Sequence, residues 1–492
     1  MQSSAVRREP APERSGAAHD GGDGRAEGRA RVGGTGRRRA TKSGTGGGRL
    51  TRRGRILVWG AGVTGVVVLG VVGVGAWIYQ DLNDNITSAK VDDKLGEDRP
   101  ENLSPGSKNI LVVGSDTRKG ANAKYGKNLD TMQSDTLMVL HIPANREWAT
   151  VVSFPRDSWV RIPACEKGDG STSDPHHFKI NEAFALGGST GDPASAAACT
   201  IKTVEANTGL RMDHFMAVDF QGFKGMVDAL DGIEVCPEQA IHNKAAKLDI
   251  EPGCQTVSGE KALGYVRVRY GVGDNSDIGR IGRQQEFMDA LAKKAKSKLT
   301  DAQAMYSFLQ AATKSLTTDP PLAGIKPLTG LANELKGIPS DRLTFLTVPN
   351  YPREADKPSD KANVVWQFPQ AADLFTSLAH DKEVTKEQLT AQTKNLVYAS
   401  NVRVQVLNGT GIGGRAADVA AKLTAAGFTV VGTGNAPQNA ASTTVSHPAG
   451  LEGQARVLST WLPKATTAQD AQAAAGVVTL VVGKDLDLEA LR

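Results

Sequence analysis

The sequence predicts an α/β protein with a mixed sheet between two helical layers. One transmembrane helix precedes this three-layer αβα domain, and a small C-terminal α/β domain follows it. Three observations predict this fold class. Strand-like apolar runs alternate with helix-like segments over residues 108–291, residues 56–79 form a long uncharged stretch, and a second β-α-β pattern begins at residue 401. A chain of 492 residues has room for all of these parts.

The first 55 residues are basic and poor in aliphatic side chains. They hold 14 lysines and arginines against 5 acidic residues, a net charge of +9; the whole chain carries +5, so residues 56–492 carry −4. A segment rich in Gly, Ala, Arg, Ser and Thr cannot bury enough apolar surface to offset its chain entropy. We therefore expect residues 1–55 to be a disordered tail. No DNA-binding signature accompanies its arginines, so we expect no nucleic-acid partner.

Residues 56–79 read ILVWGAGVTGVVVLGVVGVGAWIY and contain no charged side chain. A helix of this length spans roughly 36 Å, which is enough to cross a bilayer core of about 30 Å. A cleaved signal peptide is the alternative, but the long leader and the long apolar run favour an uncleaved anchor. The positive-inside rule keeps the basic tail in the cytoplasm. We thus expect a single-pass protein of the cell membrane, with residues 80–107 as a juxtamembrane linker and the bulk of the chain outside.

The cysteines agree with export. All four, Cys165, Cys199, Cys236 and Cys254, follow the predicted anchor. Four cysteines allow three pairings, which the sequence does not separate. Pairing within loops would join Cys165 to Cys199 and Cys236 to Cys254, whereas buried free thiols are the alternative.

Three motifs in the sequence suggest chemistry that their surroundings do not support. Residues 409–414 match the dinucleotide-binding pattern G-x-G-x-x-G, but after Asp418 the next acidic residue is Glu452, and a dinucleotide fold needs an acid about twenty positions on. We expect a tight strand-to-helix turn there and no dinucleotide. Residues 187–191 match G-x-S-x-G but follow a helix-like segment, so they do not form a nucleophile elbow. The eight histidines show no zinc-ligand spacing.

Polar residues gather at the ends of three predicted strands, NILVVGSD, SDTLMVLHIP and WATVVSFPRD. Asp116 follows the first strand, Asp135 lies at the start of the second, and Arg156 and Asp157 follow the third. Asx residues at strand ends are commonly turn formers. Two carboxylates beside neighbouring strands can instead hold one Mg²⁺ together with substrate phosphate oxygens.

The strongest local signal is YVRVRYGVGDNSDIGRIGRQQEF, which ends at residue 287. We expect a strand that presents Arg267 and Arg269 on one face, followed by a helix. Residues 262–286 contain four arginines and no lysine, and arginine is suited to bidentate phosphate recognition. The alternative is an ion-pair network that only stabilises the fold; its members would be these arginines with Asp274, Asp277 and Glu286.

These motifs, taken in order, resemble the LytR-CpsA-Psr family of cell-wall glycopolymer ligases. The resemblance rests on NILVVGSDTR, QSDTLMVLHI, VVSFPRDSWVRIP, KINEAFALGG, VDFQGFKGMVDALDGIEV and GEKALGYVRVRY…DIGRIGRQQ, and it covers residues 108–291. Residues 401–485 resemble the C-terminal domain that accompanies this family in many actinobacterial-type proteins. The basic tail and single anchor match the same layout.

The resemblance implies a phosphotransferase that moves a phosphorylated anionic glycan from a polyprenyl-pyrophosphate carrier to a peptidoglycan hydroxyl. It implies that Asp116 and Asp135 bind Mg²⁺ and that Asp277 holds arginines in place. The implied catalytic residues are Arg156, Arg267, Arg269, Asp277 and Arg280. The implied pyrophosphate-binding residues are Arg118, Arg156, Lys179, Arg267, Arg269, Arg280, Arg283 and Gln284.

Two other functions remain open from the sequence, a polyprenyl-pyrophosphate hydrolase and a non-enzymatic envelope binder or regulator. Residues 108–291 form the expected catalytic domain and residues 292–380 a helical appendage to it. Residues 381–400 are polar and are expected to be a linker to an accessory domain, residues 401–492.

Overall fold

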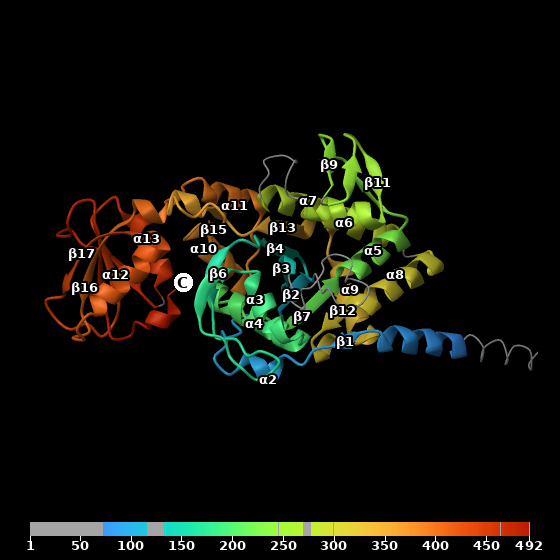
Figure 1. Cartoon of the computed structure of the whole chain (residues 1–492), viewed down its shortest axis with the longest axis horizontal. Helices are drawn as coiled ribbons and strands as arrows, with labels where there is room; N and C mark the ends of the chain where they lie inside the picture. The colour runs from blue at the N-terminus through green and yellow to red at the C-terminus, as the bar shows by residue number, and fades with distance from the viewer. Residues whose placement is uncertain are drawn as a thin grey trace, which may run out of the picture. The chain divides into compact units, whose positions relative to one another are not determined.

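The computed structural model describes residues 72–115, 132, 134–244, 246–268, 277–298, 300–462 and 464–491. These residues belong to one compact unit that begins at Gly70. The predicted basic tail and residues 56–71 of the predicted transmembrane helix lie outside the described residues. Residues 72–84 are helical (Figure 1). Within the described part of the chain, no helix is both long and apolar enough to cross a membrane.

The main domain is built on a mixed seven-stranded sheet with the order β1-β12-β7-β2-β3-β4-β13 (Figure 1). The three strands expected from apolar runs are confirmed as β2 (Lys108–Ser115), β3 (Ser134–Ile142) and β4 (Ala149–Phe154). They pair antiparallel, β2 with β3 and β3 with β4. On the other side of β2, β7 (His214–Asp219) runs parallel to it. The edges are completed by β12 (Leu316–Thr318), the two-residue β1 (Thr87–Ser88) and β13 (Leu343–Thr347).

Both faces of this sheet are buried, as the side chains of β2 show. Leu111 and Val113 pack in one apolar cluster with residues of α3 (Glu182–Gly187), α4 (Pro193–Thr208) and α10 (Gln370–Ala379). Ile110 and Val112 pack in a second apolar cluster, which includes Leu331 of α9 (Ile325–Gly337). Successive strand residues point to opposite faces, so the expected arrangement of helices on both sides of a mixed sheet is present.

A second group of helices packs against the sheet, from β7 to the ends of β4 and β13. It consists of α5 (Phe220–Ala229), α6 (Gly259–Arg267), α7 (Asp277–Ser297) and α8 (Ala302–Ser315). Their apolar side chains share a cluster with two short strand pairs. The pairs are β8 (Ile233–Val235) with β11 (Gln255–Val257), and β9 (Ile241–Asn243) with β10 (Leu248–Ile250).

The expectation that Arg267 lies on a strand is wrong, because residues 259–267 form helix α6. The alternation of valine and arginine covers only the last residues of this segment. Upstream, Ala262 and Tyr265 are buried three positions apart and pack against Phe287 of α7, which is a helical pattern. The chain leaves the helix at Val268, which has extended backbone angles. Arg267 therefore lies at the C-terminal end of a helix.

Residues 292–380, expected as a helical appendage, contribute two strands to the main sheet. β12 pairs antiparallel with β7, and β13 pairs parallel with β4. The segment also forms the strand pair β14 (Asn350–Pro352) and β15 (Val364–Trp366). Residues 381–400, expected as a linker, contain the capped helix α11 (Lys386–Thr393), whose Leu389 is buried in the main core.

Two disulfides join the cysteines in the expected loop-local pairs, Cys165–Cys199 and Cys236–Cys254. The first ties the loop after β5 (Trp159–Ile162) to α4, and the second joins the chain after β8 to the chain before β11. Both Cys165 and Cys199 are fully buried. The local pairing is therefore confirmed over the other two.

The C-terminal domain has a five-stranded sheet of order β17-β16-β20-β18-β19. Its elements are β16 (Arg403–Asn408), α12 (Arg415–Ala426), β17 (Thr429–Asn435), β18 (Thr444–His447), α13 (Glu452–Trp461), β19 (Thr466–Gln469) and β20 (Val478–Val482). The glycines at 409–414 form the expected strand-to-helix turn between β16 and α12. Gly411 and Gly414 have φ values of 78° and 82°, and a Cβ on Gly409 would lie 2.9 Å from the carbonyl oxygen of Val482. The turn thus needs glycine for its backbone, while the absence of dinucleotide binding stays a prediction.

Candidate active site

Polar residues from several strands meet at one edge of the main sheet. β2 and β7 are parallel and end there, β4 ends there, and the antiparallel β3 begins there. This topology brings Asp135, at the start of β3, to the residues that follow β4. Arg156 donates from Nη1 to Oδ1 of Asp135 at 2.6 Å. These two strand-end residues, which the sequence marked separately, are therefore in contact.

Two further arginines reach Asp135 from helices. Arg267 at the end of α6 places its Nε 3.7 Å from Oδ2 of Asp135, and its guanidinium lies 4.5 Å from the ring centre of Phe220. Arg280 lies in the first turn of α7 and donates from Nη2 to the backbone oxygen of Asp135 at 3.4 Å. Its side chain is only 2% exposed. Three guanidinium groups therefore converge on Asp135, those of Arg156 and Arg267 at its carboxylate and that of Arg280 at its backbone oxygen.

A lysine and a second carboxylate extend this arrangement. Lys179 ends β6 (His176–Lys179) and donates from Nζ to Oδ1 of Asp157 at 2.7 Å and to the backbone oxygen of Ala362 at 3.1 Å. Oδ1 of Asp157 is also 3.6 Å from Nε of Arg156. Asp157 is 4% exposed. Its buried carboxylate therefore holds both Lys179 and Arg156 in position. The sequence pointed to Asp157 only as a strand-end residue, although its place directly after Arg156 was the available signal.

Arg283 and Gln284 of α7 contact the end of α6. Arg283 donates from Nη2 to the carbonyl oxygen of Val268 at 2.6 Å, and Gln284 donates from Nε2 to that of Val266 at 2.8 Å. The last carbonyls of a helix have no partner within the helix, so both side chains cap α6. They thereby hold the helix end that presents Arg267.

A cavity that opens to solvent lies between the sheet and α5, α6 and α7, with an empty volume of about 830 Å³ when its open mouth is included. Its walls are largely apolar and include Met138, Phe223, Met226 and Leu263. One row on α7 lines it, namely Arg280, Gln284, Met288 and Leu291. This row runs from polar to apolar over roughly 16 Å at about 1.5 Å per residue. The cavity therefore has an arginine-rich end at the Asp135 cluster and an elongated apolar interior. These two features together suit an amphiphile with an anionic head.

Comparison with known families identifies the family to which this chain belongs. Residues 78–381 match the model of the LytR_cpsA_psr family. The protein belongs to the LytR_cpsA_psr family. Residues 401–486 match a second model, described as the LytR cell envelope-related transcriptional attenuator. The first match extends through β13 and α10 and ends at residue 381, in agreement with the sheet that residues 292–380 help to build.

Several curated relatives of this LytR_cpsA_psr protein are named for cell-wall synthesis. It is 36% identical over 245 residues to the probable cell wall biosynthesis protein LcpB of Corynebacterium glutamicum, a match that spans 48% of this chain and about half, 51%, of that protein. It is 28% identical to the cell wall biosynthesis protein LcpA of the same organism, over 76% of this chain and 75% of LcpA. The Bacillus subtilis polyisoprenyl-teichoic acid–peptidoglycan teichoic acid transferase TagT is 28% identical over 58% of this chain and 84% of its own length.

The structure places part of the predicted site of this LytR_cpsA_psr protein. Asp135, Arg156, Arg267 and Arg280 come together, and Lys179 joins them through Asp157. Arg283 and Gln284, also predicted to bind pyrophosphate, donate to the end of α6. Four predicted residues are not placed. Asp116, Arg118 and Arg269 lie outside the described residues, and Asp277 begins α7 but its side chain is not described.

The described residues fit one side of a Mg²⁺ site. Mg²⁺ in phosphate-handling proteins is commonly held by one or two carboxylates, with substrate oxygens and water completing the octahedron. Asp135 supplies one such carboxylate at the arginine-rich end of the cavity. Within the described part of the chain, no group of three or more acidic, histidine or cysteine ligands occurs. Asp135 is thus the predicted Mg²⁺ ligand that the structure describes, and Mg²⁺ itself stays a prediction.

Proposed function

We propose that this protein transfers a phosphorylated anionic glycan from a polyprenyl-pyrophosphate carrier to peptidoglycan, releasing polyprenyl phosphate. The observation that carries the proposal is the cluster of Arg156, Arg267 and Arg280 around Asp135 at the polar end of the 830 Å³ apolar cavity. A pyrophosphate joined to an isoprenoid chain has the matching chemistry, an anionic head on a long apolar tail. The names of TagT and its relatives agree with this substrate class.

The cavity would hold the isoprenoid chain and fix the direction of the pyrophosphate. Burying apolar chain contributes about 25 cal/mol per Å² removed from water, so a cavity of this size contributes strongly to donor binding. The row from Leu291 to Arg280 on α7 then brings the head group to the arginines. Binding energy from the unreactive tail is in this way used to position the reacting phosphate.

The arginines act on charge. In phosphoryl transfer the protein mainly positions the groups and stabilises charge on the transferring phosphoryl group and the leaving oxygen. Arg267 lies over Phe220 and near Asp135, which limits the directions in which its planar fork can point. Arg156 is held on both sides, by Asp135 and by Asp157. Arginine keeps its proton throughout, so the cluster remains cationic as charge develops.

We propose Mg²⁺ as the cofactor, held by Asp135 together with Asp116. When bound, it would neutralise charge on the phosphate oxygens. The acceptor hydroxyl oxygen forms a bond to the phosphorus that carries the glycan, and the bond from this phosphorus to the bridging oxygen breaks. The bridging oxygen leaves with polyprenyl phosphate, and the hydroxyl proton passes to a base or to water. The product is a glycan–peptidoglycan phosphodiester.

We further propose that the catalytic domain lies outside the cell and that residues 56–79 anchor it. Two disulfides in the main domain support an oxidising location, because such bonds are rare in the cytoplasm. An anchor would keep the cavity at the membrane surface, where a lipid-linked donor is found.

The testing experiment supplies full-length protein with a lipid-linked phosphorylated glycan and soluble peptidoglycan fragments. The expected products are polyprenyl phosphate and a peptidoglycan-linked phosphodiester, followed by mass spectrometry. Polyprenyl phosphate with free glycan phosphate, and no linked product, would indicate the hydrolase instead. Absence of either product with a folded, donor-binding protein would indicate the non-enzymatic binder.

A further inference from the structure

A second cavity, also open to solvent, lies where the main domain meets the C-terminal domain, with an empty volume of about 660 Å³ when its open mouth is included. The main domain lines it with Trp159, Arg353 and Lys357, and the C-terminal domain lines it with Lys422 of α12 and Trp461 of α13. Neither family-model match spans this junction, since one ends at residue 381 and the other begins at residue 401. The cavity thus exists only because the two domains pack together.

The side chain of Arg353, which forms one wall of the cavity, is held by several contacts. Arg353 is 4% exposed and pairs with Asp360. It donates from Nη2 to the carbonyl oxygen of Ala425 at 2.9 Å, across the domain boundary, and its guanidinium lies 4.2 Å from the ring centre of Trp159. A buried guanidinium fixed on three sides keeps its position when a ligand arrives.

Contacts next to the cavity hold the two domains in register. Oδ1 of Asp356 accepts a hydrogen bond from the backbone N–H of Ser400 at 2.9 Å, and its Oδ2 accepts one from the hydroxyl of Tyr351 at 2.6 Å. Phe368 of the main domain packs edge-on against Trp461, with ring centres 6.1 Å apart. The Phe368–Trp461 contact joins the two domains directly, and the Asp356–Ser400 bond holds the chain just before the C-terminal domain.

Two lysines set the charge at this cavity, because the charge of the third cation, Arg353, is offset by Asp360. Three cationic side chains line it, and among the described residues no carboxylate does. Lys357 is exposed and has no ion pair within the described part of the chain. Lys422 lies 3.1 Å from Glu489, but both side chains are largely in solvent, at 40% and 66% exposure, so this pair is weak. The two lysines favour an anionic ligand. Leu423 and Trp461 form an apolar wall, but they are only 2% and 7% exposed, so this wall excludes water and does not offer an open ring face.

The cavity is also connected to the candidate active site through one face of a strand pair. Trp159 of β5 is the direct antiparallel partner of Lys179 of β6, so the two side chains lie on the same face. His177, which lines the cavity, is two residues from Lys179 on that face, about 7 Å along the strand. Lys179 in turn contacts Asp157 beside Arg156. Lys179 and His177 therefore connect the arginine cluster to the cavity along one face of β6, and a glycan bound at the cluster can extend along this face to the cavity.

We propose that this junction cavity binds an anionic segment of a glycan, as a subsite of the transfer reaction. Its phosphate or carboxylate groups contact Lys357 and Lys422, and its apolar surface lies against the wall that includes Leu423 and Trp461. The role as a subsite rests on the proposed function, whereas the binding does not. The same chemistry occurs in an anionic donor polymer and in peptidoglycan with its lactyl and peptide carboxylates. The accessory domain then serves to complete a binding site rather than to catalyse.

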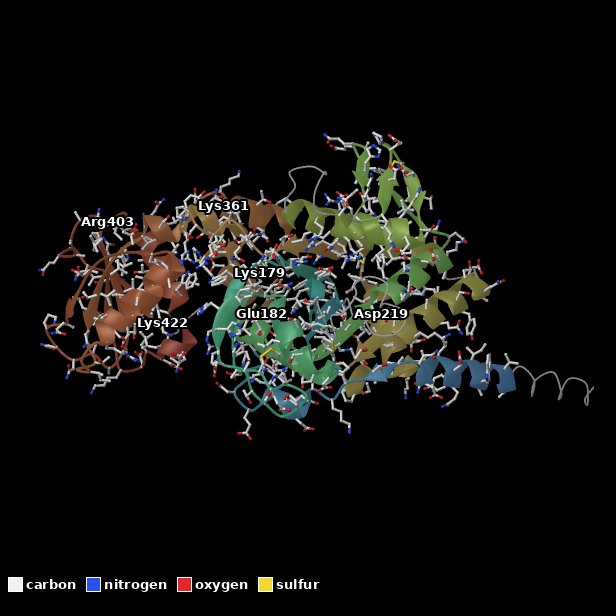
Figure 2. All side chains as sticks on the ribbon, in the orientation of Figure 1. Lys179, Glu182, Asp219, Lys361, Arg403 and Lys422 are labelled. Carbon is white, nitrogen blue, oxygen red and sulfur yellow. A yellow bond between two sulfur atoms is a disulfide. The ribbon has the colours of Figure 1, made fainter. Side chains whose placement is uncertain are left out.

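The test uses full-length protein in detergent and isothermal titration calorimetry with three probes. These are a glycerol phosphate oligomer for the donor, a muramyl disaccharide-peptide for the acceptor, and a neutral N-acetylglucosamine oligomer. The variant is Lys357→Glu/Lys422→Glu. The matched control is Lys361→Glu, because Lys361 is 75% exposed and does not line the cavity (Figure 2 labels Lys361 and Lys422). Thermal melts and transfer activity are recorded on the same samples.

The wild type should bind one of the two anionic probes, and the double variant should bind that probe at least tenfold more weakly with an unchanged melting temperature. The probe affected identifies the donor or the acceptor as the source. The neutral oligomer should bind weakly to every form. Equal binding by the double variant, equal weakening by Lys361→Glu, or no binding of either anionic probe by the wild type would each overturn the proposal. Probe binding without any transfer would instead refute the proposed function and leave the binding site standing.

Discussion

Arg267→Lys is the sharpest perturbation of the candidate site, because it keeps the charge and removes only the shape. In the structure the side chain of Arg267 is 31% exposed, lies 3.7 Å from Asp135 and covers the ring of Phe220. A lysine ammonium at this place cannot offer two parallel donors to a phosphate and cannot stack flat on the ring. If the proposed function holds, the substitution removes one bidentate phosphate contact from the transition state.

The expected loss of transfer rate follows from the free energy that one arginine–phosphate contact contributes to the transition state. Removing one well-placed donor from a charged transition state costs about 2.7–4 kcal/mol, and about 2.7 kcal/mol is a hundredfold in rate. Folding should be affected far less. The contacts of Arg267 with Asp135 and Phe220 are each worth roughly 1 kcal/mol or less, which lowers the melting temperature of a domain this large by only a few degrees.

The assay is the transfer rate at saturating donor, with a thermal melt for each variant. Arg456→Lys serves as the control, since Arg456 is 55% exposed and donates to Asp373 far from the Asp135 cluster. We expect Arg267→Lys to transfer about a hundredfold more slowly and Arg456→Lys to match the wild type. If Arg267→Lys transfers at the wild-type rate, or unfolds at room temperature, the arginines belong to a structural ion-pair network and the site lies elsewhere.

Two further predictions concern the metal and the disulfides. Asp135→Asn should raise the Mg²⁺ concentration needed for half-maximal transfer, because the proposed site loses an anionic ligand; a transfer curve against Mg²⁺ that matches the wild type would argue against Asp135 as a ligand. Replacing Cys165 and Cys199 together by serine should destabilise the main domain by about 3–4 kcal/mol, the chain-entropy value for a crosslink across 34 residues. Denaturant unfolding measures this loss, and four alkylatable thiols in the native wild type would show that neither disulfide forms.

The sequence was most informative where burial leaves a strong pattern. β2, β3 and β4 are apolar runs within the sheet, so the strands were predictable, and the sequence marked Asp135 and Arg156 as polar residues at strand ends. Their contact was not predicted, because it depends on the order and direction of the strands in the sheet. The turn at Gly409–Gly414 was predictable as well, because its glycines stand between a strand pattern and a helix pattern.

Other features leave weaker signals. Tyr265 to Arg269 alternate like a strand, yet the helix that contains Arg267 is set by residues buried upstream against α7. β12 and β13 are short edge strands, and which strand they join depends on contacts distant in sequence. The lining of the 830 Å³ cavity consists of the same residue types as a packed core, so no sequence pattern distinguishes Met226 or Leu263 from core residues.

The central claim is that the phosphorus bearing the glycan is transferred, with bond cleavage at the bridging oxygen. The most direct measurement places a radioactive phosphorus label at that position of a polyprenyl-pyrophosphate-linked glycan and follows it in a reaction with peptidoglycan fragments. The account predicts that the label appears in peptidoglycan, stable to a phosphomonoesterase, while unlabelled polyprenyl phosphate is released. Label that ends as glycan phosphate in solution, or that stays with the polyprenyl chain, would contradict it.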